Sequence, residues 1–188
     1  HLHFVTHEDA RKTVLQLGEP SRCVFNVGSL AIDSLKNIKI LKKEEISRNI
    51  DELRLNSKWI VASYHPLSYE SFDFLPELKS MLEALAELGE EYDVLFTMPN
   101  SDNKNRLITD SIKNIQKKTN HIHLKENLGT QLYLSLIANS EFAIGNSSSG
   151  LYEVPLLQKP TIDIGLRQKG RARGNSVFSP KSKKEDIL

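Results

Sequence analysis

The stretch FAIGNSSSGLYEV, residues 142–154, decides the fold and raises the question of function. An apolar run leads into Gly145 and Asn146, three serines and another glycine follow, and the apolar pattern then resumes with helical spacing. This order predicts a strand, a tight loop and a helix, which is the repeating junction of a parallel α/β sheet. In open sheets of that kind, ligands bind beyond the carboxyl ends of the strands.

The same alternation of strand and helix runs through most of the chain. Short apolar strands are predicted at residues 58–66, 92–100, 121–124, 141–145 and 160–165. The segments between them place apolar side chains at helical spacing, for example Leu78, Leu82 and Leu85. Asp102 and Thr130 are expected to cap two of these helices. The pattern predicts a Rossmann-like, doubly wound α/β domain with a mainly parallel sheet.

A smaller strand–helix–strand pattern precedes this domain. Residues 34–56 then contain ten charged side chains and only scattered aliphatic ones, which is more typical of a hinge than of a core. We therefore predict three parts: residues 1–38 as a βαβ unit, 39–56 as a linker and 57–188 as the main domain. The terminal segment SPKSKKEDIL is expected to be frayed or to end before a final helix.

Composition excludes several classes of protein. Lysine plus arginine number 25 against 24 acidic residues, so net charge favours neither nucleic acid nor a membrane surface as partner. The single Cys23 excludes an internal disulfide framework, and no Cys/His grouping has zinc-like spacing. No apolar run has the length of a membrane span, and a cytoplasmic setting is expected. The first residue is His1, so we expect an N-terminal portion before it.

The serine loop, residues 145–150, has the composition of an anion site. Backbone N–H groups at a helix start are unpaired, small residues let a phosphate approach them, and hydroxyls add further donors. The alternative is a serine that caps a helix in a tight turn, and the sequence leaves both open. The loop is not a P-loop, because the lysine of that motif is absent.

Glu153 and the basic run 165–176 extend this hypothesis. Glu153 follows Ser149 by about one helical turn, and a carboxylate there suits the two hydroxyls of a ribose, although a solvated helix glutamate fits the pattern too. The run contains Arg167, Lys169, Arg171 and Arg173 between glycines. One arginine side chain can bind two phosphate oxygens, so the run is a candidate second clamp on the same anion. A solvated basic loop is the usual alternative, and a nucleic-acid contact is a weaker one because the run lacks interleaved aromatic residues.

His65 and Asn100 each follow a predicted strand at its carboxyl end. Both side chains should therefore lie on the sheet edge that carries the serine loop. An isolated histidine is more often bonded to backbone than functional, so His65 remains open on pattern alone. His121 and His123 alternate within a short strand, and we assign them no role.

Taken in order on one α/β domain, the motifs SYHP (63–66), TMPN (97–100), GNSSSGLYEVP (145–155) and IDIGLRQKGR (162–171) resemble the UDP-N-acetylglucosamine 2-epimerase family. The resemblance covers essentially the whole chain and is nearest to the hydrolysing branch, which serves sialic and nonulosonic acid synthesis. It implies two Rossmann-like domains in the GT-B arrangement. Residues 1–38 would close the first domain, and 57–188 would be the UDP-binding second domain without its last helix.

The resemblance also implies a set of binding residues. Ser147 and Ser148 would hold the diphosphate, Glu153 the ribose hydroxyls and Arg167 a phosphate, with backbone groups of 124–131 near uracil. His65 would lie near the diphosphate and assist departure of UDP. The full set implied to bind UDP is His65, Asn100, Ser147, Ser148, Ser149, Glu153, Arg167 and Arg171. No metal and no cofactor other than the nucleotide-sugar ligand is implied.

The implied reaction converts UDP-GlcNAc to ManNAc and UDP. It requires acid and base groups against the sugar ring, and in the family these carboxylates belong to the first domain. The chain alone is therefore expected to bind UDP weakly and to catalyse little or nothing. The missing N-terminal domain and further copies of the protein are the expected partners. Two alternatives remain: a GT-B glycosyltransferase that uses a UDP-sugar, and a non-catalytic nucleotide-binding module.

Overall fold

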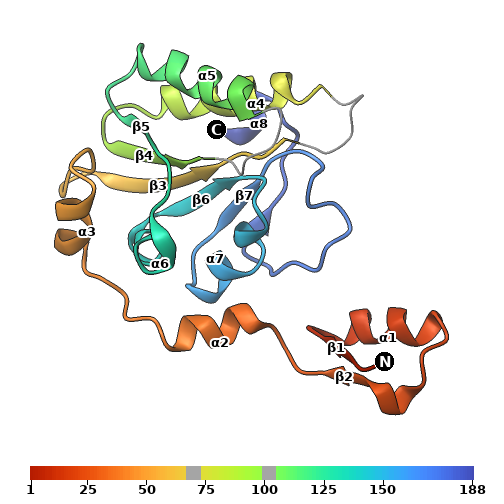
Figure 1. Cartoon of the computed structure of the whole chain (residues 1–188). Coiled ribbons are helices and arrows are strands. Elements are labelled where there is room, and N and C mark those ends of the chain that lie inside the picture. Colours follow the sequence, from red (N-terminus) through yellow and green to blue (C-terminus); the bar gives the residue numbers. More distant parts are fainter. Residues whose placement is uncertain (67–72, 99–104) are drawn as a thin grey trace. The chain divides into compact units, whose positions relative to one another are not determined.

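The computed structural model describes residues 1–66, 73–98 and 105–188, which form two compact units, His1–Ile38 and Lys39–Leu188 (Figure 1). The first unit contains strand β1 (His3–Val5), helix α1 (Glu8–Gln16), the 3₁₀ turn η1 (Ser21–Cys23), strand β2 (Val24–Asn26) and helix α2 (Leu30–Lys36). β1 and β2 pair in parallel, as expected for a βαβ unit. The stacked rings of Phe4 and Phe25 lie 5.7 Å apart between centroids.

The second unit is built on a six-stranded sheet whose neighbouring strands all pair in parallel. Its strands are β3 (Lys58–Ser63), β4 (Tyr92–Thr97), β5 (Ile122–Lys125), β6 (Phe142–Gly145), β7 (Thr161–Asp163) and β8 (Val177–Phe178). Their spatial order is β5-β4-β3-β6-β7-β8. The first strand of the unit is therefore central, and the chain winds first to one edge and then to the other. The predicted doubly wound α/β fold is confirmed.

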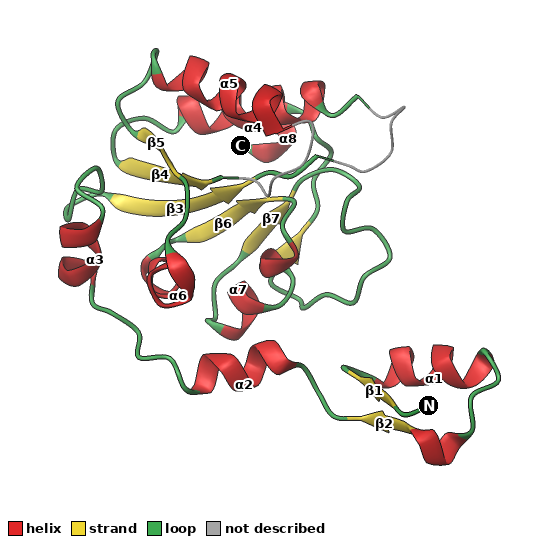
Figure 2. Ribbon diagram, in the orientation of Figure 1, coloured by secondary structure: helices red, strands yellow, loops and turns green. Residues whose placement is uncertain are grey.

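Helices cover both faces of this sheet (Figures 1 and 2). The helices α4 (Leu75–Glu87), α5 (Asn105–Gln116) and α8 (Lys184–Ile187) lie on one face. The helices α6 (Gly129–Asn139) and α7 (Glu153–Leu156) lie on the other, with α3 (Lys43–Asn49) beside α6. Two covered faces explain why the central strand β3 has five consecutive buried residues, most of them apolar.

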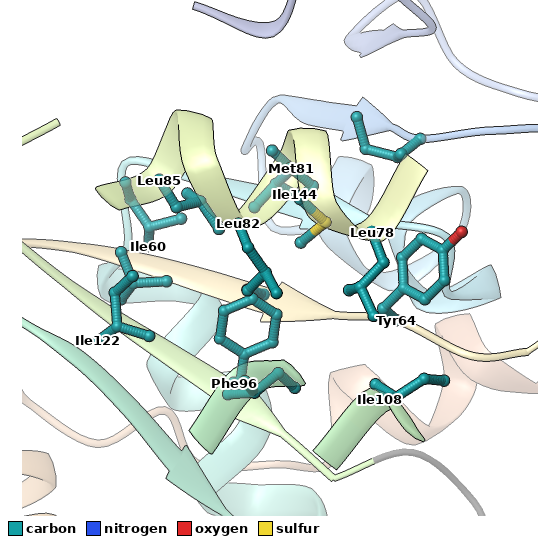
Figure 3. Close-up of a cluster of buried hydrophobic side chains, with 14 of the residues drawn as sticks. Ile60, Tyr64, Leu78, Met81, Leu82, Leu85, Phe96, Ile108, Ile122 and Ile144 are labelled. Carbon is teal, nitrogen blue, oxygen red and sulfur yellow. The ribbon is translucent and has the colours of Figure 1, made fainter. Parts of the chain in front are cut away.

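The core between α4 and the sheet follows from the spacing of apolar residues along that helix. Leu78, Leu82 and Leu85 share one helical face and are each at most 4% exposed. Figure 3 shows Leu85 near Ile60 of β3, Leu82 near Phe96 of β4 and Leu78 near Tyr64, which follows β3. The predicted helix is thus present on the predicted face.

Two details differ from the expectations, and a third prediction concerns a residue that the structure does not describe. Thr130 does not cap α6, because the helix already begins at Gly129, and the Asn127 carboxamide oxygen accepts the Gly129 N–H at 2.8 Å. Asp102 lies outside the described residues. The terminal segment, expected to be frayed, includes the short helix α8. Lys184 of this helix forms an ion pair with Glu87 of α4.

Residues 39–56 also differ from a solvated linker. They include α3 and belong to the compact unit of the large sheet. Ile46, Ile50 and Leu53 are each at most 1% exposed. The charged residues between them mask this apolar set in the sequence, because the segment is too short to show clear periodicity.

Candidate functional site

The serine loop lies where the direction of winding reverses. β3 and β6 are neighbours at the centre of the sheet, with Ser63 paired to Gly145. β3 is followed by strands on one side and β6 by strands on the other. Loops that leave two such strands separate from each other, and the crevice between them is the usual ligand site of open α/β sheets. His65 leaves the end of β3, and the serine loop leaves the end of β6.

Gly145 is required at this junction for a steric reason. Its φ is +135°, and a Cβ atom at this position would lie 1.7 Å from the carbonyl oxygen of Ser63. Only glycine lets β6 end so close to β3. The first glycine of the loop therefore fixes the backbone, and the serines after it project from a constrained turn.

Asn146 connects the loops that follow three strands. Its side chain is 2% exposed; the oxygen accepts the His65 N–H at 2.7 Å, and the amide donates to the His65 carbonyl at 2.8 Å. Its own carbonyl accepts from Arg167 Nη1 at 3.0 Å and from Gln168 Nε2 at 2.7 Å. The structure therefore brings His65, the serine loop and Arg167 together, as the sequence predicts. The connecting roles of Asn146 and Gln168 were missed.

The serines form a 3₁₀ turn, η2 (Ser148–Gly150). Ser147 precedes it, and its hydroxyl accepts the Ser149 N–H at 3.3 Å. Within the described parts of the chain, the N–H groups of Ser147 and Ser148 donate no hydrogen bond. The expected helix dipole is small here, because α7 has only four residues. Hydroxyls and open backbone N–H groups are thus the donors that the loop offers.

Glu153 begins α7 after two turn residues, so it is not on one continuous helix with Ser149 as the sequence suggested. Its carboxylate is partly buried, and among the residues with described positions the buried Oε2 atom has no hydrogen-bond partner. A buried carboxylate oxygen without a donor is costly unless a ligand supplies one. Two sugar hydroxyls would be suitable donors.

Tyr133 of α6 approaches the same loop and was missed in the sequence. Its hydroxyl donates to Ser149 Oγ at 3.0 Å. Burial raises the pKa of Tyr133, and the charge of nearby Glu153 acts in the same direction. A lone tyrosine within an apolar helix carries no signal that could have predicted this contact.

The basic run divides into different roles. Arg167 contacts the serine loop, whereas Arg173 forms an ion pair with the buried Asp163 at 3.3 Å and donates to the Gln168 carbonyl. Burial nevertheless raises the pKa of Asp163 above its usual range. Arg171 is exposed, and its side chain has no ion pair with any described carboxylate. The run is therefore not a clamp made of four equivalent cations.

Glu77 of α4 contacts the loops that follow both β3 and β7. The Tyr64 hydroxyl donates to Glu77 Oε2 of α4 at 3.0 Å. Burial raises the pKa of Glu77. Gly165 has φ +78°, and a Cβ atom there would lie 2.3 Å from the same carboxylate oxygen. The loops after β3 and β7 thus both pack against one side chain of α4.

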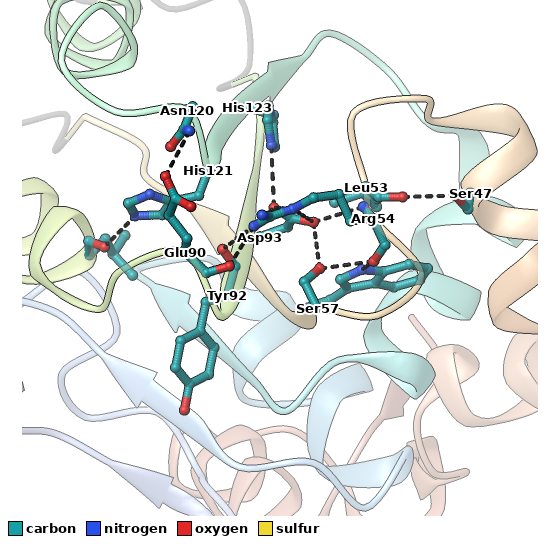
Figure 4. Close-up of polar contacts among 12 residues, drawn as sticks. Ser47, Leu53, Arg54, Ser57, Glu90, Tyr92, Asp93, Asn120, His121 and His123 are labelled. Carbon is teal, nitrogen blue, oxygen red and sulfur yellow. Dashed lines mark hydrogen bonds and ion pairs between the residues drawn. The ribbon is translucent and has the colours of Figure 1, made fainter.

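A second polar network lies at the opposite edge of the sheet, near the amino ends of β3 and β4 (Figure 4). Arg54 Nη2 lies 2.8 Å from Asp93 Oδ1, and Ser57 donates to Oδ2 at 2.5 Å. Burial raises the pKa of Asp93, but hydrogen bonds from Arg54 and Ser57 outweigh it and leave the pKa lowered. His123 lies 3.7 Å from the same carboxylate, and burial lowers its pKa. This network anchors the segment before β3.

The remaining predicted site residues are Asn100 and the segment 124–131. Asn100 lies outside the described residues. Residues 124–131 span the end of β5 and the start of α6.

Among the helices in the described parts of the chain, none is long and apolar enough to span a membrane.

Comparison with known proteins gives relatives along the full chain. The family model described as UDP-N-acetylglucosamine 2-epimerase matches residues 1–188. GDP/UDP-N,N'-diacetylbacillosamine 2-epimerase (hydrolyzing) of Campylobacter jejuni is 40% identical over 179 residues, 95% of this chain and 46% of that protein. Polysialic acid biosynthesis protein P7 of Escherichia coli is 33% identical over 187 residues, 100% of this chain and 47% of that protein. The chain spans about half the length of these relatives.

Solved structures share the fold. A UDP-GlcNAc 2-epimerase from Neisseria meningitidis bound to UDP-GlcNAc matches with a TM-score of 0.73 at 21% identity, over 99% of this chain and 51% of that one. A UDP-N-acetylglucosamine 2-epimerase from Rickettsia bellii matches with a TM-score of 0.74 at 19% identity, over 100% of this chain and 48% of that one. With a family model that spans every residue and a relative at 40% identity, the chain belongs to the UDP-N-acetylglucosamine 2-epimerase family.

Proposed function

We propose that the whole protein is a hydrolysing 2-epimerase acting on a UDP-linked 2-acetamido sugar, and that this chain supplies its UDP site. The observation that carries the proposal is the group of donors and acceptors at the β3/β6 switch point. Open N–H groups and hydroxyls of the serine loop suit a diphosphate. The unpartnered Glu153 oxygen suits ribose hydroxyls.

In this proposal each residue has a distinct task. Ser147, Ser148 and Ser149 bind the diphosphate, and Glu153 accepts from the ribose. Arg167, already fastened to Asn146, contributes positive charge, and Arg171 adds charge from the exposed part of its loop. His65 lies beside the diphosphate and assists its departure; Asn100 lines the same crevice.

The chemistry proposed for the whole protein has two steps. A base removes the proton at C2 of the sugar while the C1–O bond to UDP breaks, which gives a 2-acetamidoglucal and UDP. Water then adds across the double bond, and the 2-epimeric free sugar is released. We expect the acid and base carboxylates to come from the preceding domain. No metal or further cofactor is needed for these steps.

Binding provides the first test. Glu153→Gln and Ser147→Ala should each weaken UDP binding by about 1–3 kcal/mol. Ser147→Ala removes a hydrogen-bond donor to the charged diphosphate, and Glu153→Gln replaces a charged acceptor of two ribose hydroxyls with a neutral amide that has one acceptor oxygen. Isothermal titration calorimetry with the whole protein measures this. The exposed Lys169→Ala, in the same basic loop, serves as a control for loss of general positive charge. Unchanged affinity in both site variants would place UDP elsewhere.

The products provide the second test. Incubation of the whole protein with UDP-GlcNAc should release UDP and free ManNAc. Formation of UDP-ManNAc would instead indicate the non-hydrolysing reaction. Intact UDP-GlcNAc without an acceptor would favour a glycosyltransferase or a non-catalytic module, which are the alternative functions.

The sugar itself needs a separate comparison. The 40% identical relative is named for a diacetylbacillosamine substrate, whose sugar carries a second acetamido group. UDP-N,N'-diacetylbacillosamine should therefore be compared with UDP-GlcNAc by kcat/KM. We further propose a cytoplasmic, homo-oligomeric enzyme; the single cysteine is consistent with a reducing compartment.

A further inference from the structure

Tyr133 reaches the serine loop from an element that contributes no other side chain to the proposed set. It lies on α6, on the face of the sheet that also carries α7. Its hydroxyl lies 3.0 Å from Ser149 Oγ, and its ring lines a small cavity together with Ser63, Ser147 and Gly150. The contact thus joins α6 to the turn that we propose for the diphosphate.

The protonation state of Tyr133 gives this contact a direction. Burial raises the pKa of the phenol, and the negative charge of Glu153 raises it further. The hydroxyl is therefore neutral near pH 7 and has one hydrogen, which it donates to Ser149. A serine hydroxyl that accepts one hydrogen bond still has its own hydrogen to donate. The Ser149 hydrogen is then directed away from the tyrosine.

The geometry points to Tyr133 as a positioning residue for the nucleotide: its hydrogen bond sets the Ser149 hydroxyl as a donor to the diphosphate of UDP. The inference rests on the proposed function, since UDP is the ligand. Preorganised donors bind an anion better than donors that must first reorient. Loss of the tyrosine hydroxyl should therefore weaken UDP binding even though Tyr133 itself does not touch the nucleotide.

A double-mutant cycle on the whole protein tests this. Calorimetry with UDP should give a dissociation constant about threefold to tenfold higher for Tyr133→Phe, the range for loss of one hydrogen bond, and likewise for Ser149→Ala. The double variant should bind no more weakly than the weaker single variant, because Tyr133 acts through Ser149. A dissociation constant within twofold of wild type for Tyr133→Phe, or effects that multiply in the double variant, would overturn the inference.

Two controls separate positioning from a general structural effect. Tyr92→Phe removes a tyrosine hydroxyl near the amino end of β4, where the ring contacts Lys58, and should leave UDP binding unchanged. A purely structural role for Tyr133 would weaken binding equally in the Ser149→Ala background. If Glu153→Gln and Ser147→Ala also have no effect on UDP binding, the proposed function itself fails; if they weaken it and Tyr133→Phe does not, only the role of Tyr133 fails.

Discussion

Asn146 illustrates how a buried amide can connect the loops of a candidate site. It uses its side-chain oxygen and nitrogen on the backbone of His65, and its carbonyl on Arg167 and Gln168. Each of these groups would otherwise need a partner in a region that excludes water. The loops after β3, β6 and β7 are thereby fixed to one another, so the segments that carry the serines, His65 and Arg167 lie together at one edge of the sheet.

Asp93 has the same connecting role at the opposite edge, but with a full charge. Its side chain is 0% exposed, whereas Arg54 is 47% exposed. The carboxylate is therefore the member that depends on its partners, because it alone has lost its water. The hydrogen bonds from Arg54 and Ser57 compensate for that loss and connect the segment before β3 to β4.

Asp93→Asn should destabilise the protein by about 2–3 kcal/mol at pH 7, since hydrogen bonds to a charged group are lost. The folded pKa of Asp93 is lowered, so its stabilising effect is fully present above the unfolded value of about 4 and is lost as the pH falls below it. The difference between wild type and variant should therefore shrink from pH 6 to pH 3. Urea unfolding across that range measures it.

Asp110→Asn is the matched control, because its pair with Arg106 is exposed on α5 and should contribute less than about 1 kcal/mol at any of these pH values. An equal loss of stability at pH 3 and pH 7 for Asp93→Asn would mean that the charge of Asp93 is not what stabilises the fold.

The residues of the candidate site were only partly predictable. Ser147, Glu153, His65 and Arg167 occur in motifs that follow strands, so position along the chain was informative. Tyr133 and Gln168 act through contacts between elements that are distant in sequence, and neither residue type is unusual where it occurs. Such contacts become visible only when the sheet order is known.

The alternation of strands and helices was predictable because each buried strand is a continuous apolar run and each long helix has one apolar face. The order of strands was not fixed by these patterns, although right-handed crossovers restrict it. Short elements could not be predicted from the sequence for a physical reason. β8 has two residues and α7 has four, which is too few for a hydrophobic period to show. The 3₁₀ turn of the serines likewise depends on the fixed end of β6 rather than on helix propensity.

The element most at variance with expectation is α3. Its seven residues are mainly polar, and a helix of that length is not stable alone in water. Ile46 is 0% exposed, and Ile50 and Leu53 after it are also buried. The packing of these side chains in the core of the second unit orders the segment. The charged side chains around them gave the sequence the composition of a linker, although Arg54 pairs with the buried Asp93 and Lys43 lies over the ring of Trp59.

Ile46→Ala should therefore destabilise the second unit by about 2–5 kcal/mol, the range for truncating a fully buried aliphatic side chain. Ile40→Ala, at a position 37% exposed in the same segment, should cost less than about 1 kcal/mol. Chemical denaturation followed by the fluorescence of the buried Trp59 would measure both. Similar small effects for the two variants would mean that residues 39–56 behave as a linker after all.

The two compact units differ in what they contribute. Every described residue of the candidate UDP site lies in Lys39–Leu188, whereas His1–Ile38 is a two-stranded βαβ unit with exposed Phe4 and Leu17. A sheet of two strands is marginally stable at best unless further elements pack on it. In the proposed enzyme the smaller unit completes a first domain, and binding of the nucleotide is a property of the larger unit alone.

Residues 39–188 expressed alone should accordingly unfold in one cooperative transition and bind UDP within about threefold of the affinity of residues 1–188, a difference below about 0.7 kcal/mol. Glu153→Gln in the shorter chain should reduce that affinity as it does in the longer one. Neither chain should release ManNAc from UDP-GlcNAc, since the acid and base carboxylates are expected from the preceding domain. Calorimetry tests binding, and product analysis tests catalysis. UDP binding by residues 1–188 but not by 39–188 would assign part of the UDP site to the smaller unit. ManNAc release by residues 39–188 would place the catalytic groups within the Rossmann-like domain itself.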